Sequence, residues 1–306
     1  MKAEIPAALE GERVDRAVAM LCDVTRSDAA ALVADGAVRL DGVAVVARSR
    51  RVTAGQWLDV SLPEVVGGGD GPGLEPDPTV DVPVVHADEA VIVVDKPPGL
   101  VVHPGAGHAS GTLAQGLLAR FPELAAVGET GRPGVVHRLD VGTSGLLVVA
   151  RTPAAYASLV AQLAAHTVER RYLTLVWGTV EADAGLVDAP IGRAANDPTQ
   201  MAVVETGRPA RTRYEVLERF ADPAPTTLLE CRLETGRTHQ VRVHLAAIGH
   251  PVVGDARYRG QRRAVPAPRP FLHAHRLAFD HPSHGERSEH HSPLPADLED
   301  VREQLA

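Results

Sequence analysis

The first sixty residues alternate between helical and strand-like spacing of their apolar side chains. One segment follows the i, i+3, i+4, i+7 pattern of an amphipathic helix: Val14, Ala17, Val18 and Leu21. Ser27 can cap a second helix, and Gly36 suits the position just after its end. The inward side of this second helix is expected to hold Ala31, Leu32 and Val33.

A hairpin signal follows these two helices. Residues 38–40 and 43–45 alternate apolar and polar positions around Asp41-Gly42, and Asp-Gly between such runs is a strong signal for a two-residue turn. Residues 57–60 are expected to form one further strand. The order predicts a small unit of helix, helix, hairpin and strand.

Glycine and proline then interrupt the pattern throughout residues 65–79, which are expected to form a flexible linker. We therefore predict a small N-terminal domain over residues 1–64 and a larger domain over residues 80–306. The chain is 44% hydrophobic, which is enough for a sizeable core in the larger part.

Helix-like and strand-like runs are interleaved in this larger part. Buried strands are expected at four places, the first of them ending in a Pro-Gly turn: residues 91–96, 145–150, 172–178 and 226–233. Helices are expected over residues 154–165 and from Thr238, as a cap, to Gly249. The second of these turns three apolar side chains to one face: Val241, Leu245 and Ile248. Because the runs follow no regular β-α-β repeat, the predicted fold class is α+β.

The net charge of −8 gives no support for nucleic-acid binding on its own. The acidic excess is concentrated in residues 63–90, at −7, and residues 285–306, at −4. Residues 1–62 carry −1 and residues 91–284 carry +4, so basic patches are possible in both parts. Only two of the 31 basic residues are lysine. Arginine suits phosphate contacts, but a genome biased toward arginine codons explains this preference as well.

Cysteine usage and hydropathy bear on the compartment. Cys22 and Cys231 lie far apart and form neither a disulfide framework nor a zinc spacing, so a reducing cytoplasm is the simplest prediction. No apolar run approaches the roughly 18 residues of a transmembrane helix. The early acid at the N-terminus does not fit a signal peptide. We expect a cytoplasmic protein without membrane association.

Asp140 is the first candidate for chemistry. It lies in a polar, glycine-rich loop, residues 137–145, directly before an apolar strand. An aspartate in such a loop most often makes a local turn hydrogen bond, and a catalytic carboxylate is the alternative. A serine nucleophile does not fit, because residues 142–145, Gly-Thr-Ser-Gly, lack the G-x-S-x-G spacing and no helix follows.

The segment 233–244 is the second candidate. Gly236 permits a tight turn, and Arg237 projects beside a helix N-terminus that can hold an anion. A helix cap with a surface salt bridge explains the same residues. His239 and His244 are five apart, so they do not share a helix face as metal ligands would.

Two further features admit two interpretations each. Histidines recur between residues 273 and 291, but their irregular spacing is more typical of solvated loops than of a metal site. Tyr172 follows Arg170 and Arg171 at the start of a predicted strand. A tyrosine at that position usually packs half-buried, and it could equally offer a flat face to a nucleic-acid base.

In the N-terminal part, residues 13–17 and 25–42 resemble the S4 RNA-binding domain in their order and identity. The resemblance implies that six arginines face RNA: Arg13, Arg26, Arg39, Arg48, Arg50 and Arg51. Without it, a small helical-hairpin domain with ordinary surface arginines would explain the pattern. Thr25 stands where the family usually has serine.

In the larger part, several ordered motifs together resemble the RluA-type pseudouridine synthases. They are VIVVDKPPGLVVHPG at residues 91–105, HRLD at 137–140 with TSG at 143–145, RYL at 171–173, TGRTHQ at 235–240, GHP at 249–251 with GD at 254–255, and LHA at 272–274 with HP at 281–282. With an S4-like domain in front, the chain is most similar to the ribosomal large subunit pseudouridine synthase D type. The resemblance covers residues 12–62 and 80–300.

The resemblance implies a mixed, largely antiparallel central sheet with a catalytic cleft, and conversion of uridine to pseudouridine in RNA. The N1–C1′ bond of a flipped-out uridine would break and the base would rejoin through C5. No cofactor and no metal are expected. The implied catalytic residues are Asp140 as the carboxylate, Tyr172 as the stacking face and Arg237 as the ion-pair partner of Asp140. The implied substrate-binding residues are His137, Arg138, Thr143, His239 and Gln240.

Some alternatives remain open at this stage. Many relatives carry Lys-Asp where this chain has Val141-Gly142, which puts fine substrate contacts in doubt. The expected partner is RNA, most simply large-subunit ribosomal RNA, with transfer RNA as the alternative, and we expect a monomer. An RNA-binding protein without catalytic activity is a competing prediction. A metal-dependent hydrolase that uses the C-terminal histidines is a weaker one.

Overall fold

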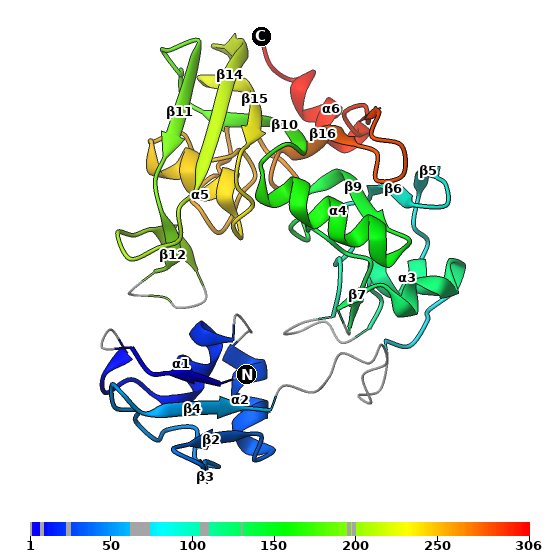
Figure 1. The fold of residues 1–306 in the computed structure, drawn as a ribbon. Coiled ribbons are helices and arrows are strands. Elements are labelled where there is room, and N and C mark those ends of the chain that lie inside the picture. The colour runs from blue at the N-terminus through cyan, green and yellow to red at the C-terminus, as the bar shows by residue number, and fades with distance from the viewer. Residues whose placement is uncertain are drawn as a thin grey trace. The chain divides into compact units, whose positions relative to one another are not determined.

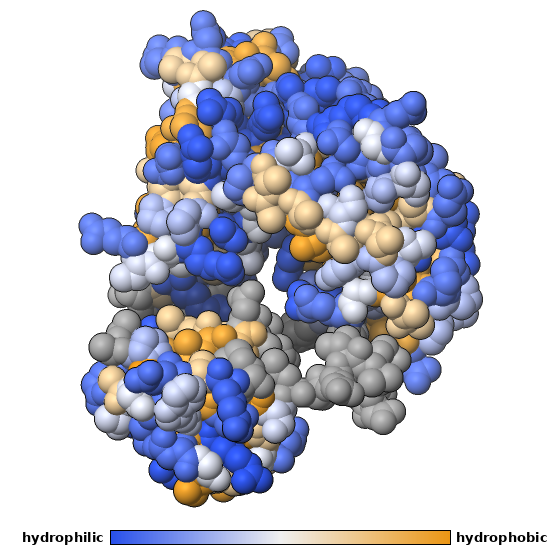
Figure 2. All heavy atoms as spheres, in the orientation of Figure 1, coloured by the Kyte–Doolittle hydropathy of each residue, from blue (hydrophilic) through white to orange (hydrophobic). Residues whose placement is uncertain are grey.

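The computed structural model describes residues 2–6, 9–22, 26–61, 74–104, 110–129, 131–194, 197 and 200–306, with only the backbone for residues 26–28. Its contacts divide the chain into two compact units, Met1–Gly68 and Gly69–Ala306. Most of the predicted linker lies outside the described residues; its last part, residues 74–79, forms no helix or strand. Hydrophilic side chains cover most of the faces drawn in Figure 2, with apolar residues scattered among them.

The N-terminal unit packs two helices, α1 (Val14–Leu21) and α2 (Arg26–Ala34), into one core with a four-stranded sheet. The sheet order is β1-β4-β2-β3 (Figure 1). Its strands are β1 (Lys2–Glu4), β2 (Val38–Leu40), β3 (Val43–Ala44) and β4 (Trp57–Val60). The predicted hairpin is confirmed, because Asp41 and Gly42 both have positive φ, at 50° and 80°, as a tight two-residue turn requires.

Three details of this unit differ from the sequence prediction. Ser27 lies inside α2 and does not cap it, since the helix already begins at Arg26. The buried face of α2 holds Ala29 and Val33, with Leu32 half-buried and Ala31 exposed, because neighbouring helix residues lie about 100° apart and three in a row cannot share one face. The strand β1 pairs with β4 and was not predicted from three residues of mixed character.

The larger unit is built on a sheet in which nine strands can be described. Eight follow the order β11-β14-β15-β10-β16-β9-β6-β5, and β17 pairs with β16. In chain order they are β5 (Val84–Ala87), β6 (Val91–Lys96), β9 (Ser144–Ala150), β10 (Glu169–Trp177), β11 (Ala184–Asp188), β14 (Arg211–Phe220), β15 (Thr226–Leu233), β16 (Leu272–Asp280) and β17 (Arg287–His291). The β9–β16 pair is parallel and the other pairs are antiparallel, which confirms a mixed, largely antiparallel α+β fold.

Helices and short elements surround this sheet (Figure 1). The helices are α3 (Leu113–Arg120), α4 (Pro153–Ala164), α5 (Gln240–Ala247) and α6 (Ala296–Arg302), with a 3-10 turn, η2 (Pro122–Ala126). Two small pairs, β7 (Gly128–Glu129) with β8 (Arg132–Pro133) and β12 (Ile191–Arg193) with β13 (Met201–Val203), lie outside the main sheet. No helix in the described ranges is long and apolar enough to span a membrane.

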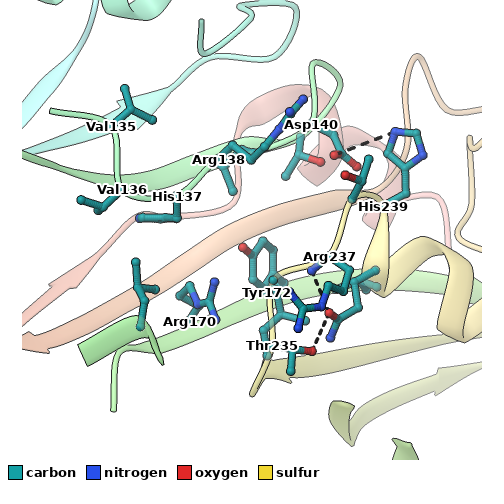
Figure 3. A pocket seen from close by; sticks show the side chains of 18 of the residues that line it. Val135, Val136, His137, Arg138, Asp140, Arg170, Tyr172, Thr235, Arg237 and His239 are labelled. Carbon is teal, nitrogen blue, oxygen red and sulfur yellow. Dashed lines mark hydrogen bonds and ion pairs between the residues drawn. The ribbon is translucent and has the colours of Figure 1, made fainter. Parts of the chain in front are cut away.

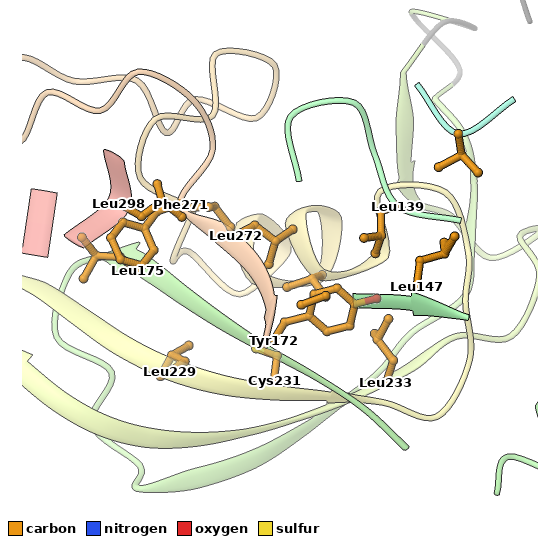
Figure 4. Close-up of a cluster of buried hydrophobic side chains, with 14 of the residues drawn as sticks. Leu139, Leu147, Tyr172, Leu175, Leu229, Cys231, Leu233, Phe271, Leu272 and Leu298 are labelled. Atoms are coloured by element: carbon orange, nitrogen blue, oxygen red, sulfur yellow. The ribbon is translucent and has the colours of Figure 1, made fainter. Parts of the chain in front are cut away.

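Strand β9 is buried on both faces, which explains its uninterrupted apolar run. Leu147 joins the cluster in Figure 4 that also contains Tyr172 and Phe271, while Leu146 and Val148 face a second cluster under α4. The two layers fix β9 in register, and with it the loop that precedes the strand.

Gly145 is required where β9 meets β16. Its φ is 111°, and a Cβ atom there would lie 2.3 Å from the carbonyl oxygen of Ala274. The parallel pair therefore approaches so closely that only glycine fits.

The start of α5 differs from the sequence prediction. The cap residue is His239 in a left-handed conformation with φ of 58°, so the helix begins at Gln240 and Thr238 does not cap it. Val241 and Leu245 are buried as predicted, but Ile248 is 39% exposed. This shift of the helix start determines which arginine of the segment reaches the loop before β9.

Candidate active site

A pocket of about 590 Å³ opens in the larger unit (Figure 3). Its walls come from the loop before β9, the start of β10, the end of β15 and the loop before α5. Three distant segments of the sequence therefore meet here. Every residue that the resemblance assigns to catalysis or substrate binding lines this pocket: His137, Arg138, Asp140, Thr143, Tyr172, Arg237, His239 and Gln240.

The loop that carries Asp140 is held through its backbone. Lys96, fully buried at the end of β6, donates from Nζ to the carbonyl oxygens of Pro97 and Leu100, each at 2.9 Å, and of Val141 at 3.4 Å. Burial lowers the pKa of Lys96 to about 7, although the negative charge of Asp140 acts in the opposite direction. Lys96 thus ties the Pro-Gly turn after β6 to the residue that follows Asp140.

A second cation holds the same loop from the other side. Arg269 donates to the carbonyl oxygen of Gly142 at 3.1 Å and is itself paired with Asp297 on α6 at 2.6 Å. The amide of Thr143 closes the turn by donating to the carbonyl oxygen of Asp140 at 3.0 Å. The backbone of residues 140–143 is therefore fixed without any contribution from the side chain at 141.

Asp140 pairs with Arg242 of α5. One guanidinium nitrogen of Arg242 donates to Oδ2 of Asp140 at 3.0 Å, and the other two donate to Asp255 at 2.6 and 3.0 Å. Burial alone would lower the pKa of Arg242, but its hydrogen bonds to Asp255 and the charge of Asp140 outweigh burial and raise that pKa. The guanidinium is thus a permanent cation that keeps Asp140 oriented.

The expected ion pair between Asp140 and Arg237 is not the one that the structure contains. Arg237 lines the pocket but donates from Nε to the carbonyl oxygen of Pro209 at 3.0 Å. Because α5 starts after His239, Arg242 occupies its first turn and reaches Asp140. The predicted ion pair of Asp140 with Arg237 is therefore wrong, and Arg242 is the partner.

His239 completes the surroundings of the carboxylate. Its Nε2 lies 4.0 Å from Oδ1 of Asp140, and its Nδ1 is 2.8 Å from the hydroxyl of Tyr258. The ring of Tyr258 also lies under the guanidinium of Arg242, at 5.1 Å. Burial lowers the pKa of His239, and the charge of Asp140 opposes that effect. A neutral imidazole therefore stands beside Oδ1 of Asp140.

Tyr172 lies on the floor of the pocket and is 5% exposed. Burial raises the pKa of Tyr172 to about 12, and the neighbouring positive charge of Arg170 offsets part of that rise. The side chain is consequently an uncharged phenol near neutral pH. Figure 3 shows Tyr172 between Arg170 on one side and Arg237 on the other.

Gln240 is fully engaged within the protein. Its Oε1 accepts from the hydroxyl of Thr235 at 2.7 Å and from the amide of Arg237 at 3.0 Å. Its Nε2 donates to the carbonyl oxygen of Arg211 at 2.9 Å and to the hydroxyl of Thr212 at 3.0 Å. All four hydrogen-bonding positions of the amide are taken, so its contribution to the site is to shape the loop.

His137 and Arg138 differ in their surroundings. The Nε2 atom of His137 accepts from the amide of Val148 at 3.1 Å. Burial and the charge of Arg170 lower the pKa of His137 to about 3. Arg138 is exposed at the rim of the pocket.

The N-terminal arginines are divided between internal and exposed roles. Arg13 is paired with Asp15 at 2.8 Å, and Arg51 donates to the carbonyl oxygen of Gly11 at 2.6 Å. Arg39, Arg48, Arg50 and Arg51 are all exposed. The side chain of Arg26 lies outside the described residues.

The C-terminal histidines do not gather into a metal site in the described part of the chain, where no group of three suitable ligands was found. His273 is buried and lies 3.0 Å from the hydroxyl of Ser144 and 3.2 Å from the carbonyl oxygen of Ser292. Because that carbonyl can only accept, His273 donates from Nε2 and accepts from Ser144 at Nδ1. His273 of β16 therefore links β9, through Ser144, to the segment after β17, through Ser292.

The fold is α+β, and the pocket presents a fixed carboxylate, a phenol ring and several arginines, a set of groups typical of an enzyme active site. The family described as RNA pseudouridylate synthase matches residues 90–247. A protein from Bacillus subtilis, described as an uncharacterized RNA pseudouridine synthase, is 42% identical over 97% of this chain and 95% of its own length.

Two further proteins support the same assignment. Ribosomal large subunit pseudouridine synthase D of Pseudomonas aeruginosa is 43% identical over 97% of this chain and 92% of its own length. The solved structure of human RNA pseudouridylate synthase domain containing 1 has a TM-score of 0.58 and 29% identity over 74% of this chain and 90% of that chain. The chain therefore belongs to the RNA pseudouridine synthase family. It is an isomerase that converts uridine to pseudouridine in RNA.

Proposed function

We propose that the substrate is large-subunit ribosomal RNA and that Asp140 is the catalytic carboxylate. The substrate proposal rests on the relatives from Pseudomonas aeruginosa and Nitrosomonas europaea, both described as ribosomal large subunit pseudouridine synthase D and similar to this chain over almost its whole length. The observation that carries the catalytic proposal is the 3.0 Å pair between Asp140 and Arg242 at the edge of the pocket.

Asp140 must be ionised to act on the sugar or the uracil. Arg242 binds only Oδ2 of Asp140, so Oδ1 is left toward the pocket and His239. With the carboxylate fixed by its backbone turn and by one guanidinium nitrogen, the free oxygen is oriented before the substrate arrives.

The uridine has to leave the RNA stack to reach this carboxylate, at a cost of a few kcal/mol. In our proposal the uracil stacks on Tyr172, a contact worth about 1–3 kcal/mol, which offsets most of that cost. Tyr172 stays a phenol because burial raises its pKa to about 12. Arg138 and Arg237, on the walls of the pocket, would contact the phosphates on either side of the flipped nucleotide.

For the N-terminal unit we propose RNA binding through the exposed arginines Arg39, Arg48 and Arg50. Arg13 and Arg51 would act indirectly, by holding the start of α1 through Asp15 and Gly11. Because this unit has its own core, we expect a variant that lacks residues 1–64 to keep the fold of the larger unit. The kcat/KM of this variant on structured ribosomal RNA should fall, while the Tm of its larger unit should stay that of the full-length protein. Unchanged kinetics would remove the RNA-binding role of this unit.

The decisive experiment maps pseudouridines in ribosomal and transfer RNA of cells that lack the protein, complemented with wild type or with Asp140→Ala. We expect the wild type to restore specific sites in large-subunit RNA and the variant to restore none. Restoration by Asp140→Ala would overturn the catalytic assignment. If the cells that lack the protein lose pseudouridines only in transfer RNA, transfer RNA is the substrate. If they lose no pseudouridine in either RNA, the protein binds RNA without catalysis.

We further propose that the protein works as a cytoplasmic monomer, because this chain completes the proposed site by itself and its two cysteines are free. Light scattering of the purified protein at working concentration should give the mass of a single chain. A stable dimer whose disruption abolishes activity would refute this part.

A further inference from the structure

Arg170 is a buried cation that lines the pocket and is used by none of the roles above. Its side chain begins on β10, two residues before Tyr172, so both point to the same face of the strand. It is 7% exposed, and within the described ranges neither a carboxylate nor a hydrogen-bond acceptor partners it; its Nε is buried without a partner. Burial lowers the pKa of Arg170, as expected for a guanidinium that is removed from water without a counterion.

His137 supplies a second unused donor beside it. Its Nε2 accepts from the amide of Val148, and burial together with Arg170 keeps the ring neutral, so the ring proton is on Nδ1. That Nδ1 is also buried without a hydrogen-bond partner in the described structure. Arg170 and His137 therefore present donors and lack an acceptor.

The position of these donors relative to Asp140 restricts what can bind them. Figure 3 shows His137 and Arg170 to one side of Tyr172, and Asp140 with His239 to the other. Gly236 leaves room for the guanidinium, since a Cβ atom there would lie 2.8 Å from Nη1 of Arg170. A ring that stacks on Tyr172 with its sugar at Asp140 would direct its far edge toward the two donors.

We propose that Arg170 and the Nδ1–H of His137 bind the C4 carbonyl oxygen of the flipped uracil and stabilise the negative charge that this base acquires when its glycosidic bond breaks. The inference rests on the proposed stacking of uracil on Tyr172. It makes Arg170 a catalytic residue that contacts the departing base, and His137 its partner.

The chemistry of the isomerisation requires such stabilisation. When N1–C1′ breaks, its electron pair leaves with the uracil, while Asp140 either bonds to C1′ or takes a proton from C2′. The charge on the free base spreads over N1, O2 and O4. In the second half C5 bonds to C1′, the carboxylate is released or returns its proton, C5 loses its proton and N1 gains one, so the overall reaction is an isomerisation. Two hydrogen-bond donors at O4 therefore stabilise the uracil anion, and the transition state that leads to it, more than they stabilise the neutral uridine.

A backbone phosphate is the other oxygen group that such donors could bind. The depth of Arg170 favours the base, because phosphates of folded RNA stay at the surface, where Arg138 is exposed at the rim. An acceptor that becomes an anion during the reaction also explains why a guanidinium is kept buried without a permanent counterion.

The test compares Arg170→Gln with Arg171→Gln in the full-length protein. Arg171 is the adjacent residue of the same type on the other face of β10, where it is paired with Glu169 and Glu230 and does not line the pocket. With RNA containing the target uridine, single-turnover rates at saturating enzyme should fall about 100- to 1000-fold for Arg170→Gln, as for loss of one oxyanion donor. The rate of Arg171→Gln should stay within about 3-fold of wild type, and Kd for RNA should change little in either variant.

A second substrate separates base stabilisation from other roles. RNA with 5-fluorouridine at the target position carries a uracil that is a better leaving group, because fluorine stabilises the anion. If Arg170 stabilises that anion, Arg170→Gln should slow cleavage of the N-glycosidic bond of 5-fluorouridine about 10-fold less than it slows the reaction of uridine. Equal defects on both substrates would overturn the proposal.

The remaining outcomes are also decisive. A loss that appears in Kd with a reduced salt dependence would identify a phosphate contact and refute the proposal. A loss of thermal stability in Arg170→Gln that matches its loss of activity would identify a structural role and refute it too. Wild-type protein that modifies no uridine would instead refute the proposed substrate, so the two failures are distinguishable.

Discussion

Arg242 is held between two carboxylates, and its replacement by methionine should damage stability as well as activity. Its side chain is 10% exposed, and those of Asp255 and Asp140 are 1% and 16% exposed. Methionine would leave Asp255 buried without its cation. Removing one partner of a buried ion pair costs about 3–5 kcal/mol. In a domain of this size each kcal/mol lowers Tm by about 2–4 °C, so we expect a loss of about 6–20 °C.

Asp140→Ala provides the matched comparison. It removes only the third contact of Arg242, which keeps both hydrogen bonds to Asp255. No buried charge is left alone, so the free energy of unfolding should fall by less than about 2 kcal/mol. We expect Asp140→Ala to lose catalysis with near-normal stability, and Arg242→Met to lose both.

The assay can be confined to the larger unit. The chain has two tryptophans, the exposed Trp57 in the N-terminal unit and the buried Trp177 in the larger one. In a Trp57→Phe background, denaturant unfolding followed by tryptophan fluorescence reports the larger unit alone. If Arg242→Met unfolds within about 1 kcal/mol of wild type, the reasoning about the buried charge is wrong.

Three other substitutions test separate parts of the structure. Gly145→Ala forces a methyl group to within 2.3 Å of the Ala274 carbonyl oxygen, so denaturant unfolding should show a loss of about 1–3 kcal/mol or more, and unchanged stability would contradict the close β9–β16 approach. Lys96→Met removes three contacts to the turn and the loop that carries Asp140, so single-turnover kinetics should show a lower rate with little change in RNA affinity, and wild-type kinetics would exclude this positioning role. Burial and the charge of Arg170 hold the pKa of His137 at about 3, against about 6.5 in the unfolded chain, so the unfolded state binds more protons and stability should fall by up to about 1.4 kcal/mol per unit as pH is lowered from about 6.5 toward 3. Unfolding curves of His137→Gln should show a shallower pH dependence, and identical slopes would assign the effect to other groups.

The sequence was sufficient for the elements whose signal is local. The strand over residues 226–233 lies where the apolar run predicts it, and the Asp41-Gly42 turn has the geometry that its two residues favour. Strands β14 and β17 were not predicted, because they are half-exposed and polar and depend on pairing with distant partners. Local periodicity carries no information about such pairing.

The site was predictable as a set of segments, and its contacts were not. The Asp140 loop, Tyr172 and the segment before α5 do meet in one pocket. The arginine that binds Asp140 depends on where α5 begins, and a left-handed His239 moves that start beyond Thr238. Arg242 lies in the first turn of α5 and Arg237 in the loop before it, so the sequence alone does not show which of the two reaches Asp140.

Backbone anchoring of the Asp140 loop also frees the side-chain position next to the carboxylate. Lys96 and Arg269 hold the carbonyl oxygens of Val141 and Gly142, and the Val141 side chain is 49% exposed. The side chain at 141 can therefore be exchanged while the carboxylate stays in place, whereas a Cβ atom at 142 would lie 3.2 Å from Cδ of Pro270 and would require a small shift of that ring. Replacing Val141-Gly142 by Lys-Asp is therefore expected to change which RNA the enzyme accepts more than the chemistry at Asp140.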